Sequence, residues 1–159
     1  MEQFFLEKYN LKISTTPVDL NTGANTGERI SMKDAKRVTF VCVMGDSTSA
    51  TTDFSLKQHN AASAGTSKAL SVANPYYRKA GAETEFTKVT PSSATDNFVP
   101  TAFANEPGIV VFEVLAEDLD VENDYAWVSL DAADAAAAKL GAVIAIVEQK
   151  SKPAYDVTI

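Results

Sequence analysis

Several chemically informative residue types are scarce in this chain of 159 residues, which has one cysteine, one histidine and one tryptophan. The lone Cys42 excludes a framework of internal disulfides. No segment approaches the ~18 consecutive apolar residues of a membrane-spanning helix, so we expect no integral membrane protein. The first residues have no basic stretch followed by an apolar core, so no secretory signal is expected and the chain should stay where it is made.

Basic residues are also unevenly distributed. Residues 89–138 contain no lysine, arginine or histidine but hold ten of the 21 acidic residues, and the whole chain has a formal charge of -7. Nucleic-acid binding requires a basic surface that displaces counterions from phosphate, so we expect no nucleic-acid partner. The one tight basic cluster, Lys33, Lys36 and Arg37, is interpreted as a solvated turn before a strand.

The strongest catalytic motif is Gly45-Asp46-Ser47, which follows an apolar strand and resembles the nucleophile block of GDSL-type serine hydrolases. That chemistry needs a base to take the proton from the serine hydroxyl, and the family supplies a histidine late in the chain. Here the one histidine, His59, follows Ser47 closely and ends an alternating strand. We therefore interpret the motif as a turn, His59 as a surface residue and Cys42 as core volume, and we predict no catalytic residue and no enzyme.

Carboxylates recur at two-residue intervals in the acidic segment 117–124, at Asp118, Asp120, Glu122 and Asp124. Such spacing can place oxygen ligands around a hard cation. An EF-hand loop also requires glycine at its sixth position and glutamate at its twelfth, where this chain has Asn123 and Ser129. We therefore predict no metal site and no cofactor, and we keep a carbohydrate- or cation-binding β-sandwich module as an alternative function.

Short β-branched or alternating segments dominate the rest of the chain. Strands are predicted at 37–44, 53–59, 67–72, 83–90, 109–115, 125–130 and 142–147. A helical turn is expected within 116–124, a short helix or loop over 131–139, and a long loop over 91–108 that is a functional excursion or contains a further strand. About seven or eight short strands with little helix predict a mainly β fold, a single β-sandwich or jelly-roll-like barrel.

The N-terminal segment differs from this pattern. Residues 1–27 are interpreted as an arm or extension and residues 28–159 as the β-rich domain. Residues 1–13 favour a short amphipathic helix or an extended arm that adds to a neighbour, and 14–27 a loop with repeated Asn-Thr-Gly turns. Aromatic residues near a terminus indicate burial against a partner. The candidate interface residues are Phe4, Phe5, Leu6 and Tyr9. Trp127 and Tyr125 are expected in the core or in half of an interface patch.

The sequence between residues 37 and 147 resembles the small head decoration, or cement, proteins of tailed bacteriophages. One part of the resemblance is a strand with Leu56-Lys57-Gln58, followed by a small-residue turn that ends in Lys68-Ala69-Leu70. A later part is Val111-Phe112-Glu113-Val114 ahead of Leu119-Asp120. Further resembling stretches are 37–44, 125–130 and 143–147, whereas 1–27 and 91–108 have no counterpart.

The resemblance implies a β-rich module on the outside of an icosahedral head. Such proteins commonly bind as trimers at threefold positions and clamp neighbouring capsomers. We therefore expect a non-enzymatic virion protein whose partners are the major capsid protein and further copies of itself. A phage tail, neck or fibre-associated structural protein is the alternative within the same class.

Overall fold

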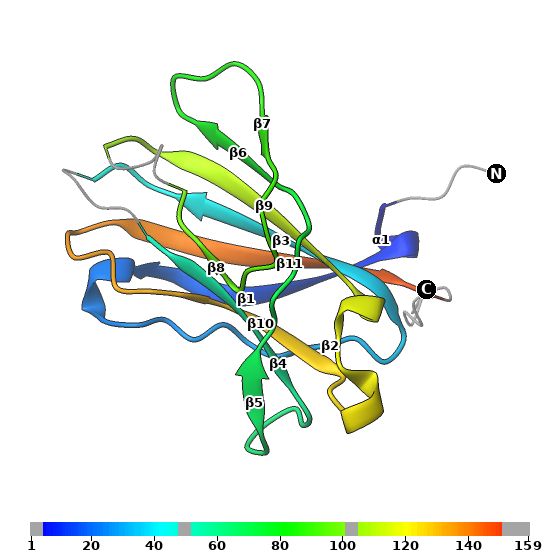
Figure 1. Cartoon of the computed structure of the whole chain (residues 1–159). Helices are drawn as coiled ribbons and strands as arrows, with labels where there is room; N and C mark the ends of the chain where they lie inside the picture. The colour runs from blue at the N-terminus through cyan, green and yellow to red at the C-terminus, as the bar shows by residue number, and fades with distance from the viewer. Residues whose placement is uncertain (1–4, 48–51, 101–104, 151–159) are drawn as a thin grey trace, which may run out of the picture.

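Strands make up 50% and helices 9% of the computed structural model, which describes residues 5–47, 52–100 and 105–150 (Figure 1). The elements are α1 (Phe5–Lys8), β1 (Tyr9–Asp19), η1 (Leu20–Thr22), β2 (Ile30–Ser31), β3 (Ala35–Met44), β4 (Phe54–His59), β5 (Ser67–Ala69), β6 (Tyr76–Ala80), β7 (Thr87–Val89), β8 (Asn97–Phe98), β9 (Gly108–Leu115), η3 (Ala116–Asp118), η4 (Val121–Asn123), β10 (Trp127–Ala132) and β11 (Leu140–Gln149). The η elements are single turns of 3-10 helix.

The larger of two antiparallel sheets has six strands in the order β1-β11-β3-β9-β6-β7. Its centre is formed by β11, β3 and β9, which are the longest β-branched runs of the sequence and pair along most of their length. The β6–β7 hairpin extends the sheet at one edge, and β1 ends it at the other (Figure 1).

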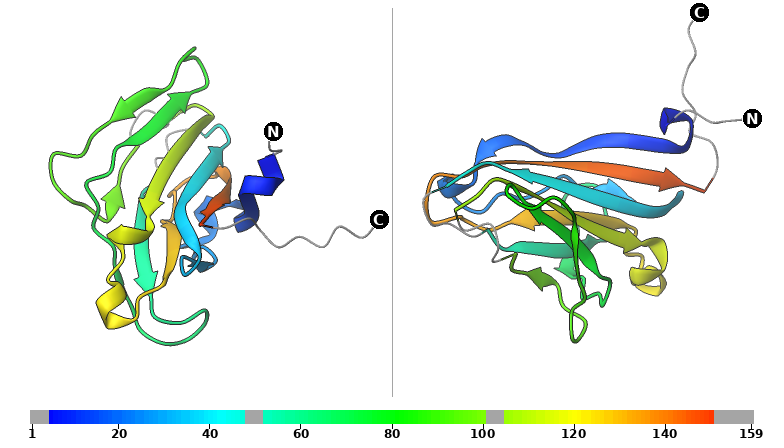
Figure 2. Two further views of the ribbon diagram at one scale, coloured as in Figure 1. Left: turned by 90° about the vertical axis from the view of Figure 1, so that its right-hand side faces the viewer. Right: turned by 90° about the horizontal axis from the view of Figure 1, so that it is seen from above.

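The smaller sheet has five strands, with the path β2-β10-β4-β5 and with β8 pairing to β4. It packs against one face of the larger sheet, and the two layers are visible in Figure 2, where α1 projects beside the start of β1. This arrangement confirms the predicted β-sandwich.

The core lies between the two sheets. On β3 the buried side chains Val38, Phe40 and Cys42 alternate with more exposed ones, as the twofold period of a strand requires. Phe112 of β9 lies at the centre of an aromatic cluster whose ring centroids are 5.0 to 5.5 Å away, formed by Phe54, Tyr76 and Phe98. These large buried rings join strands of both sheets into one core.

Four strands lie where the sequence predicts none or leaves the choice open, and one of them is the two-residue strand β2. The predicted loop over 14–27 is wrong for its first part, because β1 runs to Asp19. Residues 76–80 form β6, which the sequence analysis missed, and the long segment 91–108 contains the two-residue strand β8. Backbone pairing to β11, β10, β9 and β4 holds these peripheral strands, so they need little apolar alternation of their own.

The connections also differ in detail from the predictions. The helical turn expected within 116–124 is present as η3 and η4. Residues 133–139 form a loop without helix, in which Asp134 Oδ1 accepts a hydrogen bond from the Ala136 backbone N–H and Ala136 has a φ of 57°. The alanine-rich run therefore adopts the loop form of the two that were left open, because its length is below that of a stable isolated helix.

The N-terminal segment contains both of the structures expected for residues 1–13, one after the other. A single helical turn covers Phe5–Lys8, and an extended strand begins at Tyr9. This strand pairs with β11 of the same chain, so residues 9–19 belong to the larger sheet.

Candidate functional site

An apolar row crosses the outer face of the larger sheet. Ile13 of β1 lies opposite Ile144 of β11, which lies opposite Val41 of β3. Val41 in turn lies opposite Val111 of β9, and Val111 opposite Tyr77 of β6. Residues in register point to the same side of a sheet, so five strands contribute one continuous line of apolar side chains.

The neighbouring rows widen this line into a patch. Leu11 lies opposite Ile146, and Ala142 lies opposite Val43, which lies opposite Ile109. We call the whole set the apolar face; its members are Leu11, Ile13, Val41, Val43, Tyr77, Ile109, Val111, Ala142, Ile144 and Ile146. Ile13 is 58% exposed, Val43 47% and Ile144 42%, and the other members on β3, β6, β9 and β11 are half-buried by their neighbours alone.

The apolar face is not required for the core, because the core is on the opposite side of the same strands. Isolated exposed apolar residues are normal on soluble proteins, whereas a contiguous apolar patch marks an interaction surface. A flat surface built from rigid central strands also loses little conformational entropy when a partner covers it. The apolar face is therefore the leading candidate for a binding surface.

A charged cluster borders one end of the apolar face. Glu148, in register with Tyr9 and Arg37, forms ion pairs with Arg37 at 2.8 Å and with Lys8 at 3.4 Å. Arg37 also reaches Glu113 at 3.4 Å. Burial acts to raise the pKa of Glu148, but the hydrogen bond from Lys8 and the charge of Arg37 outweigh it, so this pKa lies below its usual value. The cluster forms a polar rim beside the patch.

The predicted interface residues lie at this same end. Phe5 and Leu6 are 50% and 58% exposed, and the Phe5 ring stacks on the Tyr9 ring at 4.8 Å between centroids. Tyr9 lies opposite Glu148, which places the pair next to the charged rim. The fourth predicted residue, Phe4, lies outside the described residues. The structure thus brings Phe5, Leu6 and Tyr9 beside a much larger apolar surface that the sequence analysis missed.

The Gly45-Asp46-Ser47 motif directly follows β3, and Ser47 N–H donates to Asp46 Oδ1 at 2.8 Å. Its hydroxyl lies 3.5 Å from the Nζ atom of Lys139, a buried residue that the sequence analysis did not consider. Burial lowers the pKa of Lys139, and the charge of Asp46 acts in the opposite direction. Among the described residues, the side chain placed near the Ser47 hydroxyl is thus Lys139, whereas the His59 ring contacts Ser67 and Ser129.

His59 is buried at 3% exposure, so its interpretation as a surface residue is wrong. Its Nδ1 lies 2.6 Å from Ser67 Oγ and its Nε2 3.0 Å from Ser129 Oγ. Arg29 lies beside this site, because its guanidinium reaches from beside β2 to the Ala61 carbonyl and to Ser67 Oγ on β5, the same hydroxyl that His59 contacts. Burial, with a smaller contribution from the charge of Arg29, lowers the pKa of His59.

Two of the carboxylates of segment 117–124, Asp118 and Asp120, already have partners within the chain. Asp118 Oδ2 accepts hydrogen bonds from Leu115 N–H at 2.8 Å and from the Asn74 amide at 2.7 Å. Asp120 pairs with Lys68, and the hydrogen bond from Lys68 is the main reason why its pKa is lowered. Within residues 5–47, 52–100 and 105–150, no three His, Cys, Asp or Glu side chains are placed to hold a metal ion.

The remaining sequence candidates are structural. Cys42 is fully buried, as expected, and burial raises the pKa of its thiol. Tyr125 is buried beneath the Lys68 ammonium, 4.3 Å from the ring centroid. Trp127 is half-buried and alternates with the core residue Val128, so it faces away from the core on the smaller sheet.

Comparison of the chain with protein-family models, with curated proteins and with solved structures finds no match. Among the described residues, no helix has the length and apolar character needed to cross a membrane. The functional argument therefore depends on the geometry of the surfaces.

Proposed function

We propose that this protein is a non-enzymatic structural protein of a bacteriophage virion, a decoration or cement protein that binds the outside of the head and stabilises the shell. The observation that carries the proposal is the apolar face, a contiguous surface on the centre of the larger sheet that no second layer of the described residues covers. The resemblance of residues 37–147 to decoration proteins supports the same function.

The mechanism is thermodynamic. A protein that binds the assembled shell and not its dissociated parts stabilises the shell by its binding free energy. The contribution is repeated at each symmetric position, and a homotrimer multiplies the strength of attachment because its second and third contacts are intramolecular. No step in this function requires a catalytic residue, a metal or a cofactor.

We assign the contact with the major capsid protein to the apolar face and to Phe5 and Leu6 beside it. An interface of this type has an apolar centre and a polar rim. The apolar face provides the centre, and the Arg37–Glu148 cluster provides charges that fix the register of the partner. The same surface also fits a tail, neck or fibre protein, so the location on the virion distinguishes these two proposals.

The alternative of a cation-binding module depends on the acidic segment 117–124. The hydrogen bonds of Asp118 and the ion pair of Asp120 favour a structural role for this segment instead. A calcium titration followed by thermal unfolding separates the two functions. We expect the same melting temperature with and without calcium, and a marked rise would favour the cation module.

The proposal is tested first on the genes beside the one for this chain, where we expect a major capsid protein, and then with shells assembled from that protein. The purified chain is mixed with the shells and sedimented, and the melting temperature of the shells is measured with and without it. We expect saturable binding and a higher melting temperature for the decorated shells. Binding to isolated tails and not to shells would favour the tail protein, and binding to neither would refute a virion role.

A further inference from the structure

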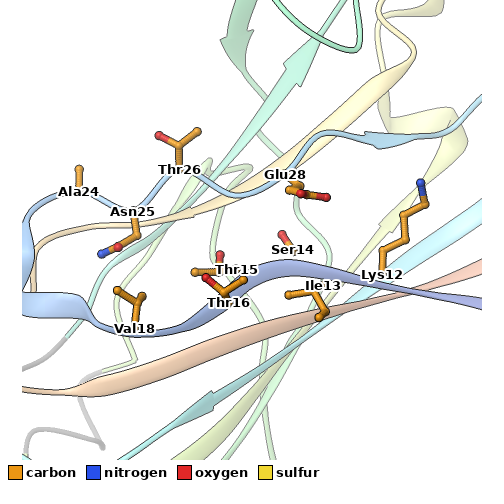
Figure 3. A pocket seen from close by; sticks show the side chains of 10 residues that line it. All are labelled: Lys12, Ile13, Ser14, Thr15, Thr16, Val18, Ala24, Asn25, Thr26 and Glu28. Atoms are coloured by element: carbon orange, nitrogen blue, oxygen red, sulfur yellow. The ribbon is translucent and has the colours of Figure 1, made fainter.

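A groove of about 720 Å³ lies between β1 and the segment 24–28 that follows η1. It opens at the side of the sandwich, where the edge of the larger sheet faces the edge of the smaller one. In Figure 3, Ser14, Thr15 and Val18 of β1 point toward the segment, and Asn25 points back toward β1. The groove shares Ile13 with the apolar face, whose other members lie on the outer side of the sheet and do not line the groove.

Two buried hydroxyl groups in this groove have no partner. Ser14 and Thr15 are 3% and 8% exposed, and neither Ser14 Oγ nor Thr15 Oγ1 forms a hydrogen bond with any described residue. Buried polar groups in folded proteins are almost always hydrogen-bonded, because an unpaired hydroxyl loses its interaction with water without compensation. The two hydroxyls therefore indicate a ligand with hydrogen-bonding groups of its own.

The backbone of β1 is also open along this side. β1 ends the strand order of the larger sheet, and its pairing with β11 contains register shifts after Ile13 and after Thr15. Glu28 N–H donates to the Ser14 carbonyl at 2.8 Å, so the segment 24–28 already occupies this edge at Ser14, and no strand of the described residues pairs with the rest of it. Proteins rarely leave a long edge strand unprotected, and an added strand is a common way to cover one.

The chain itself contains a segment with the pattern of such a strand. Beyond the described residues, Tyr155, Val157 and Ile159 alternate with Asp156 and Thr158, which is the twofold period of a strand with one apolar and one polar face. The groove has matching character, with Val18 and Ile13 as apolar lining and Lys12 as a cation suited to Asp156.

The length of chain outside the described residues is sufficient for exchange between copies. Nine residues follow Lys150, whose N–H bonds to the Asp34 carbonyl at the end of the sheet where β1 begins. Fully extended, they span roughly 30 Å, which is enough to reach an adjacent molecule. The donor and acceptor surfaces differ, so copies can exchange the segment reciprocally in a dimer or pass it head to tail around a closed ring such as the proposed trimer.

We propose that residues 154–159 of a second copy bind in this groove as an added strand along β1. The inserted backbone supplies partners for the Ser14 and Thr15 hydroxyls, and the alternating side chains match the mixed lining. This inference rests on the homo-oligomer of the proposed function and specifies how that oligomer is joined.

The test uses two full-length variants. Val157→Asp places a charge on the apolar side of the donor segment, and Thr16→Trp fills the groove from an exposed position. The controls are Thr158→Asp on the polar side of the segment and Thr87→Trp, an exposed threonine on the opposite edge strand β7. Mass is measured by light scattering, and circular dichroism verifies that each variant is folded.

We expect the wild type and both controls to form the oligomer and each test variant to be a monomer. Mixing Val157→Asp with Thr16→Trp then gives a heterodimer, because one chain retains an intact groove and the other an intact donor segment. Oligomers of wild-type mass for both variants would overturn the inference, and so would a mixture that stays monomeric. Shell binding is measured separately, so monomers that still bind shells overturn the exchange and leave the proposed function intact.

Discussion

Replacing Ile144 by lysine tests whether the apolar face binds a partner. Ile144 lies in the transverse row between Ile13 and Val41, with Ala142 and Ile146 on either side of it along β11, and is 42% exposed. The substitution therefore removes apolar contact area from the middle of the proposed interface. The aliphatic stem of the introduced lysine still covers part of the neighbouring side chains, and the lysine ammonium group remains in water in the free protein.

The two effects of this substitution differ in size. Full burial of an isoleucine side chain is worth about 1.5–3 kcal/mol, so covering the exposed part of Ile144 contributes about 1 kcal/mol to binding. Burying an unpaired ammonium costs at least about 1 kcal/mol more, and the total of about 2 kcal/mol weakens the dissociation constant about 30-fold. The free energy of unfolding changes by less than about 1 kcal/mol, because the position is on the surface.

The assay is sedimentation with shells over a range of protein concentrations, together with urea unfolding of each variant. The matched control is Val121→Lys, which changes another exposed apolar residue, 63% exposed, in η4 and outside the apolar face. We expect weaker binding for Ile144→Lys, unchanged binding for Val121→Lys and similar stability for both. Wild-type affinity of Ile144→Lys would refute the assignment of the binding surface.

Three further predictions concern the fold and the rejected chemistry. In Gly27→Ala the new Cβ lies 2.2 Å from the Leu130 carbonyl oxygen, so urea unfolding should show a loss of about 1–3 kcal/mol, whereas Gly45→Ala, with nearest contacts of 3.4 Å, should change little. Burial and the charge of Arg29 lower the pKa of His59, so on acidification the unfolded chain binds the proton before the folded chain does. The free energy of unfolding should therefore fall as the pH drops below the ordinary histidine pKa of 6.5. His59→Gln should reduce this dependence of stability on pH. Ser47→Ala should hydrolyse an activated ester at the wild-type rate, and a loss of turnover would instead indicate catalysis by Ser47 with Lys139 as base.

The central strands were predictable from sequence, and the peripheral ones were not. Residues 37–44, 109–115 and 142–147 are long β-branched runs whose identity as strands does not depend on context. By contrast, β1 and β6 contain polar and charged residues and are held by backbone hydrogen bonds to a neighbour far away in the sequence. No local pattern records that neighbour, so these two strands emerge only from the tertiary structure.

The candidate site was visible in the sequence in a form that suggested something else. The strand 37–44 is apolar on both faces, a pattern typical of a strand buried on both sides. Only one of these faces is covered, because the smaller sheet lies on a single side of the larger one. The sequence of this strand does not distinguish an outer face covered by a further layer of the same chain from an outer face covered by a partner protein. Phe5, Leu6 and Tyr9 were predicted as interface residues because aromatic residues near a terminus are unusual without a docking surface.

The Arg29 side chain makes the two outer faces of the sandwich unequal. It lies on the smaller sheet beside His59 and donates hydrogen bonds to the carbonyls of Ala61 and Ala64 in the hairpin at 60–66. The larger sheet, by contrast, has an apolar outer surface. If attachment uses the larger sheet, every attached copy has the same orientation, with the hairpin at 60–66 directed to the solvent. A foreign peptide inserted into that hairpin would then be displayed outward, in a regular array, at every occupied position.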